Sequence, residues 1–397
     1  MRRAFLVTAA FIALMPAIGP AQAQTRGPGA PLEVMLKPYL ERYGLPALSA
    51  AVVKNGRIVA SGVVGTRRLG ANIPATINDR FHIGSDTKAM TSLLAAMLVE
   101  EGKLKWDSTV AESFPELAST MAPGLGAVTL AQLLSHIGGI SSDTAALDNL
   151  VQRSYQQDEL NLDELRYWVI KDLVTQPLQS KPGEKFAYSN LGYTLVGAML
   201  ERASKKTWEE LIVERVFTPL KLRTAGLGPQ SSLGRVDAPL GHKPQDNGLP
   251  KVFLAGPNGD NPELIGPAGT AHMSVLDFAA WAAWNAGELK RGPQLVKPAT
   301  LKKLHTGVIE MANPKAPPGT PALGNYGYGW LTVKLPFASG PMLYHGGSNE
   351  KNLAYIFVDP QQDFALVMMT NLGGGKAEEA LKALSAELYK RFAPAAR

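Results

Sequence analysis

The stretch FHIGSDTKAMTSLLAAML, residues 81–98, joins a short β-rich run to an apolar run with helical spacing. It places Ser85 at the start of the predicted helix and Lys88 one turn later on the same face. The amide groups of a first helical turn favour a developing negative charge. A desolvated lysine amine can lose its proton and act as a base toward the serine, or stabilise its alkoxide. Taken alone, the two residues also fit a capping serine and a solvated lysine.

The S-x-x-K pattern is weak evidence by itself, because the chain contains it twice. The second match runs from Ser348 to Lys351 and lies between β-rich runs, where side chains three residues apart need not converge. Other stretches must therefore decide whether Ser85 and Lys88 form a chemical device.

A second polar stretch, Tyr188-Ser189-Asn190, lies in a predicted turn just before an apolar helix. In a functional interpretation, Tyr188 relays protons to and from Ser85, with its pKa lowered by nearby lysine charge. Asn190 would then orient Lys88 or a substrate amide. The structural alternative is that Asn190 caps the helix and Tyr188 packs.

The third stretch is YHGGS, residues 344–348, on a predicted edge strand that suits backbone pairing with an extended substrate. The His-x-Gly pattern also begins at His82 and at His136, which we interpret as structural histidines, although His82 is close in sequence to Ser85. No H-E-x-x-H motif occurs, and the remaining histidines have no metal-ligand spacing. The sequence predicts neither a metal site nor a cofactor.

S-x-x-K, Y-S-N and H-G-G in this order resemble the three motifs of the serine β-lactamase and penicillin-binding-protein superfamily. The Tyr-x-Asn form of the second motif is most similar to the class C β-lactamase-like branch, which includes carboxylesterases, D-aminopeptidases and DD-peptidases. The similarity covers nearly the whole chain after the first 23 residues. It includes TLAQLLSHIGGI (129–140), GPAGTAHMSVLDFAAW (266–281) and YGYGW (326–330).

The resemblance implies a role for each site residue. Ser85 is the acylated nucleophile, Lys88 and Tyr188 are the base and the proton relay, and Asn190 supports them. The backbone N–H groups of Ser85 and Ser348 form the oxyanion hole. The implied fold is an α/β lobe and a helical lobe with the site in the cleft between them.

The third motif departs from the family pattern, because β-lactamases usually carry Lys-Thr-Gly where this chain has His345-Gly346-Gly347. A lysine provides a permanent positive charge for a β-lactam carboxylate, whereas a histidine is mostly neutral at pH 7. We expect this imidazole to face Tyr188 and the acyl end of the substrate. Efficient penicillin hydrolysis is therefore not expected, and esters or peptides are the better candidates.

The two ends of the chain predict one antiparallel sheet. A helix over 31–43 stops at Gly44, and β-rich runs at 48–53 and 57–64 flank Asn55-Gly56, a hairpin signal. Three more β-rich runs, PMLYHG, NLAYIFVD and FALVMMTN, precede an amphipathic helix over 376–392. We therefore predict an α/β fold with a sheet lobe over about 30–80 and 320–397.

The middle of the chain, about residues 81–319, predicts an inserted and mostly helical lobe. Two stretches rich in glycine and proline predict long loops at 241–269 and 312–329, which often border a binding site. The predicted helices are 85–101, 129–136, 161–175, 191–204, 207–216 and 274–286.

The N-terminus, MRRAFLVTAAFIALMPAIGPAQAQ, has the pattern of a secretory signal peptide over residues 1–23, with cleavage near Ala23. The alternative, a membrane-spanning helix, is disfavoured by the short apolar run and by Pro16 and Pro20. We predict an exported protein, periplasmic or secreted, with no stable membrane insertion after cleavage. The sequence contains no cysteine, which excludes disulfides and thiol nucleophiles.

The composition limits the classes of molecule that the protein is expected to bind. The net charge of +6 is modest, and the basic residues are scattered rather than clustered, so no nucleic-acid partner is expected. We predict a serine hydrolase for a small ester, amide or short peptide, of undetermined oligomeric state. The alternatives are a penicillin-binding sensor that is acylated with little turnover, or a true class C-like β-lactamase. An α/β-hydrolase lipase is excluded, because no G-x-S-x-G motif occurs.

Overall fold

The computed structural model describes residues 29–141, 144–246, 248–256, 258–311 and 322–394. The predicted signal peptide lies outside these residues, as does the first part of the predicted loop 312–329. Within the described part, nine strands form one sheet in the order β1-β3-β2-β14-β13-β12-β11-β10-β9. They are β1 (Ala30–Pro31), β2 (Ala47–Lys54), β3 (Arg57–Gly65), β9 (Ile309–Met311), β10 (Gly324–Tyr326), β11 (Leu331–Lys334), β12 (Pro341–Ser348), β13 (Leu353–Asp359) and β14 (Phe364–Thr370).

Strands from both ends of the chain meet in this sheet, which confirms the predicted fold class. Neighbouring strands are antiparallel except β1 and β3. The β2–β3 hairpin turns at Asn55 and Gly56, whose φ angles of 53° and 71° suit the turn that an Asn-Gly pair prefers. Strand β14 then pairs with β2, and the Asn371 side chain accepts a hydrogen bond from the Ala47 N–H at 2.8 Å.

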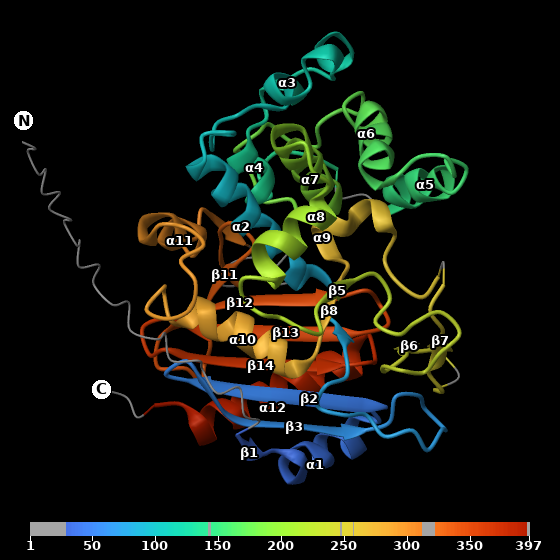
Figure 1. Ribbon diagram of the computed structural model, residues 1–397, viewed down its shortest axis with the longest axis vertical. Coiled ribbons are helices and arrows are strands. Elements are labelled where there is room, and N and C mark those ends of the chain that lie inside the picture. Colours follow the sequence, from blue (N-terminus) through green and yellow to red (C-terminus); the bar gives the residue numbers. More distant parts are fainter. Residues whose placement is uncertain (1–28, 142–143, 247, 257, 312–321, 395–397) are drawn as a thin grey trace, which may run out of the picture.

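Helices cover both faces of the sheet, because its central strands are apolar on both sides. Every residue of β13 and β14 is buried. Along β2, Leu48, Ala50 and Val52 belong to a core with helices α1 (Glu33–Tyr43) and α12 (Gly375–Phe392), whereas Ala51 and Val53 belong to the core with α10 (Val275–Ala286). In Figure 1, α10 and α12 lie over the sheet, most of the other helices lie beyond its β11–β12 side, and α1 lies at the opposite end.

The middle of the chain contains most of the remaining helices and two small sheets. Helix α10 falls inside the predicted helical lobe, yet it packs against β2 and β14 (Figure 1). The predicted loop 241–269 contains short elements, including β6, β7 and α9. The elements are α2 (Thr87–Glu100), α3 (Val110–Ser113), α4 (Leu130–Leu134), α5 (Thr144–Ser154), α6 (Leu162–Leu173), α7 (Asn190–Ser204), α8 (Trp208–Ile212), α9 (Gly266–Gly269), α11 (Pro298–Leu304), β4 (Phe81–His82), β5 (Gly226–Leu227), β6 (Gly241–Lys243), β7 (Lys251–Phe253) and β8 (Ala271–Met273).

A buried ionic cluster fixes three of these helices to one another. The Arg166 guanidinium of α6 is fully buried and donates hydrogen bonds to Glu201 of α7 and Glu209 of α8. Glu201 also accepts from the Trp208 N–H at 2.9 Å. Loss of one partner would leave a buried charge without compensation. The cluster therefore holds α6, α7 and α8 in fixed positions relative to one another.

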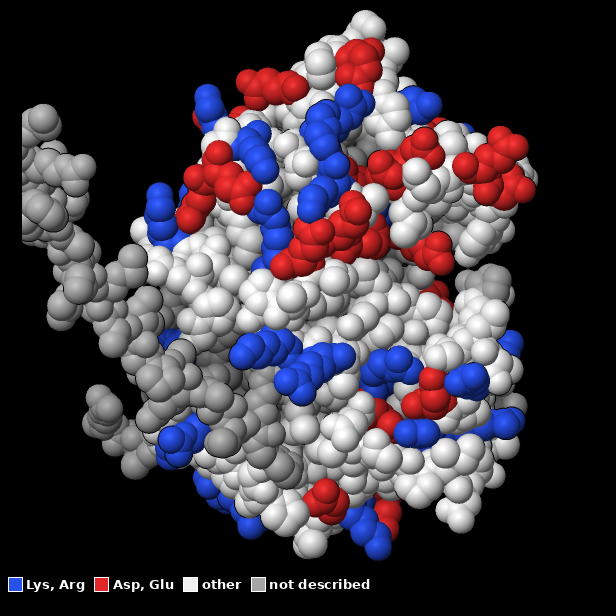
Figure 2. All heavy atoms as spheres, in the orientation of Figure 1, with Lys and Arg blue, Asp and Glu red and all other residues white. Residues whose placement is uncertain are grey.

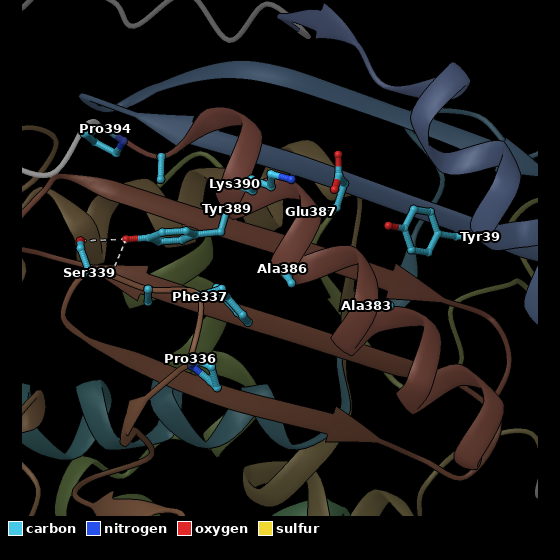
Figure 3. Close-up of a pocket in the computed structure, with 12 residues that line it drawn as sticks. Tyr39, Pro336, Phe337, Ser339, Ala383, Ala386, Glu387, Tyr389, Lys390 and Pro394 are labelled. Carbon is cyan, nitrogen blue, oxygen red and sulfur yellow. Dashed lines mark hydrogen bonds between the residues drawn. The ribbon is translucent and has the colours of Figure 1, made fainter.

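On the face shown in Figure 2, side chains of both charges occur: most Asp and Glu lie in the upper part together with Lys and Arg, and a broken row of Lys and Arg crosses the middle. A hollow does open on the α12 side of the sheet (Figure 3). It lies between Tyr39 of α1, Phe337 and Tyr389, and the Ser339 N–H donates to the Tyr389 hydroxyl at 2.9 Å. Because Ser85 lies on the opposite face, this hollow is separate from the candidate site. None of the described helices is both long and apolar enough to cross a membrane.

Candidate active site

Ser85 lies in a tight turn between β4 and α2. The 3₁₀ turn η1 (Gly84–Asp86) begins with Gly84 at a φ of 51°, a left-handed conformation that glycine adopts without strain. The Thr87 hydroxyl donates to the Gly84 carbonyl at 2.6 Å and closes the turn. As a result, Ser85 remains partly exposed at the N-terminal end of α2, where the sequence places it.

The Lys88 amine is fully buried beside this serine. Its Nζ lies 3.0 Å from Ser85 Oγ, 2.8 Å from Asn190 Oδ1 and 2.7 Å from the Ala268 carbonyl oxygen. A neutral amine has two N–H donors and one lone pair. Two of these neighbours are obligate acceptors, so the lone pair is left for the serine hydroxyl proton.

Electrostatics support the same assignment. Burial lowers the pKa of Lys88 well below its usual value, and the nearby Asp86 charge opposes this effect only in part. A lysine that is neutral near physiological pH can serve as a general base. The geometry and the pKa direction together favour Lys88 as the group that takes the Ser85 proton.

Tyr188 also lies beside the nucleophile, where its hydroxyl is close enough to the Ser85 side chain to affect its pKa. Lys88 Nζ lies 4.7 Å from the centre of its ring. The expected lowering of the tyrosine pKa is wrong: burial raises the pKa of Tyr188, and this effect outweighs the opposing effect of Ser85. A phenol with a raised pKa stays protonated, so Tyr188 is suited to pass on a proton rather than to act as a phenolate base.

The structure separates the roles of the two residues that follow. Ser189, not Asn190, caps helix α7, and its Oγ accepts from the Gly192 N–H at 3.0 Å. This leaves the Asn190 side chain free to hold Lys88. The functional interpretation of this stretch, in which Asn190 orients Lys88, therefore agrees with the contacts.

The third motif lies on β12, directly beside the nucleophile turn. A Cβ atom added at Gly347 would lie 2.7 Å from the Ser85 backbone nitrogen, and one added at Gly84 would lie 2.3 Å from the Ser348 backbone nitrogen. Two glycines thus allow the turn and the strand to approach closely. The amides of Ser85 and Ser348 are brought together, which is the arrangement that an oxyanion hole needs.

Strand β12 is not an edge strand along its whole length. It pairs with β11 only as far as Tyr344, whereas its pairing with β13 continues to Ser348. The segment 345–348 therefore has a ladder partner on one side among the described residues. That half of the strand retains the free edge expected for pairing with a substrate.

His345 is placed differently from the expectation. Its Nε2 lies 3.1 Å from the Tyr326 hydroxyl and its Nδ1 lies 3.6 Å from Asp86 Oδ1, so the ring does not face Tyr188. The imidazole is buried because it lies on the face of β12 that packs on η1. Burial, and after it the charge of Lys88, lower the pKa of His345 to about 3. The histidine is neutral at pH 7, as the sequence suggested.

Gly346 points to the opposite face of the strand. A Cβ atom there would lie 2.6 Å from the Tyr344 hydroxyl and 3.1 Å from the Tyr355 ring. A larger residue would therefore displace these tyrosines, which explains why glycine fits here. The position offers no hydroxyl of its own to a substrate.

The second S-x-x-K match is not a second site. The Ser348 hydroxyl donates to the Asn352 carbonyl at 2.8 Å, and Lys351 Nζ donates to the Asn349 carbonyl at 3.3 Å. The two side chains have separate partners, as expected for a pattern that falls between strands. Among the described residues, no cluster of histidine and carboxylate side chains is suited to hold a metal ion.

Three further residues lie around the nucleophile, and sequence reasoning named only His136 among them. His136 was interpreted as structural, and its Nδ1 accepts from the Ser189 N–H at 3.1 Å while its ring packs 4.3 Å from that of Tyr188. It positions the second motif. Asp86 is buried and neither of its oxygens has a hydrogen-bond partner among the described residues. The Ala268 carbonyl, which accepts from Lys88, belongs to the GPAGTAHMS segment. The resemblance of that segment to the family was the sequence signal that could have identified it.

The fold and this constellation define a serine hydrolase, with Ser85, Lys88 and Tyr188 brought together where α2 begins. The Beta-lactamase family model matches residues 32–390. The chain therefore belongs to the Beta-lactamase family, in agreement with the resemblance in its three motifs.

Individual relatives are distant. Protein flp of Staphylococcus aureus (strain MW2) is 22% identical over 370 residues, which cover 92% of this chain and 68% of that protein. The structure is similar to the octameric penicillin-binding protein homologue from Pyrococcus abyssi, with a TM-score of 0.71, 25% identity, and coverage of 90% of this chain and 76% of that one. It is also similar to the D-stereospecific amidohydrolase from Streptomyces sp., with a TM-score of 0.67, 21% identity, and coverage of 88% and 98%.

Proposed function

We propose that this serine hydrolase forms an acyl-enzyme on Ser85 and hydrolyses a small ester, an amide or a short peptide. The observation that carries the proposal is the set of neighbours of Lys88 Nζ, which leaves one lone pair for Ser85. In the first step, Lys88 takes the serine proton and Oγ attacks the substrate carbonyl carbon. The resulting oxyanion is stabilised by the N–H groups of Ser85 and Ser348.

Collapse of the tetrahedral intermediate breaks the bond to the leaving group. Tyr188 gives its proton to that group and regains one from the Lys88 ammonium, whose Nζ lies 4.7 Å from the centre of the Tyr188 ring. A water molecule then attacks the acyl-enzyme, with its proton passing back along the same path. Hydrolysis releases the acid and restores Ser85.

The third motif favours neutral substrates. The neutral His345 and the side-chain-free Gly346 provide no permanent cation and no hydroxyl for a β-lactam carboxylate. We therefore propose that β-lactamase activity is weak or absent. The similarity to a D-stereospecific amidohydrolase supports D-aminoacyl amides as candidate substrates beside simple esters.

A substrate panel tests this proposal. It contains p-nitrophenyl butyrate, D-aminoacyl amides, a D-Ala-D-Ala peptide and a chromogenic cephalosporin, assayed with wild type and with Ser85→Ala. We expect sustained turnover of an ester or amide by wild type, none by the variant, and one phosphonate adduct on Ser85 by mass spectrometry. A burst of one equivalent without further turnover would instead identify a penicillin-binding sensor, and an adduct on Ser348 would refute the assignment.

Export is a second part of the proposal and rests on the N-terminal sequence alone. We propose that residues 1–23 direct the chain out of the cytoplasm and are removed near Ala23. N-terminal sequencing of the mature protein from fractionated cells tests it. A mature chain that still begins at Met1 would overturn it.

A further inference from the structure

Asp260 lies between the two segments that provide the oxyanion-hole amides. It precedes α9 in the loop region that the sequence marked at 241–269. Its Oδ1 atom lies 2.7 Å from His82 Nε2 and accepts a hydrogen bond from Asn349 Nδ2 at 2.9 Å. All three side chains are buried, with His82 fully inaccessible and Asn349 2% exposed. One carboxylate oxygen therefore contacts both segments.

The first segment is the nucleophile turn. The Gly84 N–H donates to His82 Nδ1 at 3.0 Å, and His82 Nε2 lies 2.7 Å from Asp260 Oδ1, a polar contact that lacks the geometry of a hydrogen bond. Gly84 immediately precedes Ser85. The carboxylate thus fixes the imidazole, and the imidazole fixes the peptide that leads into the Ser85 amide.

The second segment is the turn after β12. Asn349 immediately follows Ser348, and its Oδ1 accepts from Asn352 Nδ2 at 3.0 Å. The Ser348 hydroxyl in turn donates to the Asn352 carbonyl at 2.8 Å. The Asn349 side chain therefore transmits the position of Asp260 to the turn that carries the Ser348 amide.

Asp260 is ionised at neutral pH. Burial acts to raise its pKa, but His82, the Asn349 amide and the Asn261 N–H together hold the pKa below its usual value. Its negative charge strengthens the hydrogen bond from the Asn349 amide and the electrostatic contact with His82. The two contacts to His82 and Asn349 are accordingly suited to hold their segments in place.

We propose that Asp260 is a positioning residue that sets the distance between the Ser85 and Ser348 amides, acting through His82 on one side and Asn349 on the other. The inference rests on the proposed function, because the oxyanion hole matters only if Ser85 is acylated. Donors must lie about 2.7–3.1 Å from the oxyanion, and a misplacement of ~1 Å costs about 10²-fold. A residue that merely supported a loop would change stability without changing the rate of each folded molecule.

The test compares Asp260→Ala and Asp260→Asn with the control Asp359→Ala. Asp359 is likewise a buried aspartate and accepts hydrogen bonds from Gln361 and Gln362, but it lies at the end of β13 remote from Ser348. Fluorophosphonate titration counts the competent active sites in each preparation. We then measure KM and kcat for p-nitrophenyl butyrate, with kcat expressed per titrated site. We also measure the inhibition constant of a boronic acid that places an oxygen in the oxyanion hole.

We expect Asp260→Ala to lower kcat about 10²-fold with KM nearly unchanged, and to weaken boronic acid inhibition by a similar factor. Asp260→Asn keeps a neutral acceptor and should lose about tenfold, and the control should retain the wild-type rate at each titrated site. Wild-type kcat in Asp260→Ala would overturn the inference. If that variant does not fold, a wild-type rate in Asp260→Asn overturns it equally. These outcomes differ from a failure of the proposed function, in which the fluorophosphonate would not label Ser85 even in the wild-type protein.

Discussion

The close approach of β12 to the nucleophile turn makes Gly347→Ala a sensitive perturbation. The backbone of Gly347 does not have a positive φ, so alanine is compatible with its conformation. The obstacle is contact alone: the new Cβ atom would lie 1.8 Å from the Ile83 carbonyl oxygen and 2.7 Å from the Ser85 nitrogen. The substitution therefore tests the geometry of the site without a change of charge or hydrogen-bonding group.

The magnitude follows from these distances. Because Cβ atoms essentially never approach another atom closer than 3.0 Å, strand and turn must separate by at least about 1.2 Å. Such a shift moves one amide out of hydrogen-bond range of an oxyanion bound by the other. Loss of one oxyanion donor costs about 10²–10³ in kcat, or ~2.7–4 kcal/mol.

The assay measures kcat for an ester substrate at each titrated active site, with the midpoint of thermal unfolding as a control for folding. Gly340→Ala is the matched control, since it lies just before β12 and an added Cβ atom there meets nothing within 4 Å. We expect the control to retain wild-type activity. If a folded Gly347→Ala variant kept its kcat within about threefold of wild type, the proposed oxyanion hole would be wrong.

Four further changes test other parts of the structure. Because Lys88 must be neutral to act as a base and burial lowers its pKa, kcat/KM should rise tenfold per pH unit up to a pKa below the usual value for lysine, and a flat profile would contradict this role. His345→Lys should speed acylation by a cephalosporin while ester hydrolysis stays within about tenfold, and no gain would refute the substrate argument. Arg166→Met should cost ~3–5 kcal/mol in the free energy of unfolding, with unchanged kcat at each titrated site, because it leaves Glu201 buried without its partner. Burial lowers the pKa of three histidines to about 3, 3 and 4; they are His345, His305 and His272. Each of them takes up a proton only on unfolding, so the free energy of unfolding should fall by ~1.4 kcal/mol per pH unit for each histidine as the pH falls from 6.5 toward 4. A constant free energy of unfolding in urea titrations over this range would exclude the linkage.

The sequence was sufficient for features that local pattern controls. Asn55-Gly56 between β-rich runs predicted the β2–β3 hairpin, and Gly44 marked the end of α1, where its φ is 63°. The helix that starts after Ser85 brought Lys88 to the serine through i, i+3 spacing. The sheet from both chain ends followed from the apolar runs there, and the comparisons confirm the fold class and the family.

Features that depend on tertiary packing were not predictable in the same way. Periodicity predicted α10 as a helix but contains no information on its position, and it packs on the sheet rather than with the helices around it in sequence. The pKa of Tyr188 was expected from charge alone, whereas burial dominates it. His345 was placed by analogy, and the alternation of β12 turns it toward Asp86 and Tyr326. Asp260 carried no local signal, since its partners are distant in sequence.

The pairing of β2 with β14 also has a consequence for how the chain reaches this state during synthesis. Ala47 and Asn371, which are hydrogen-bonded, are separated by 324 positions. At ~5–20 residues per second, a ribosome needs roughly 15–60 s between the two. During that interval β2 is an apolar segment with one edge unpaired, of the kind that promotes aggregation. We expect truncation just before β14 to yield insoluble protein rather than a smaller enzyme, because β2 would then keep this edge unpaired.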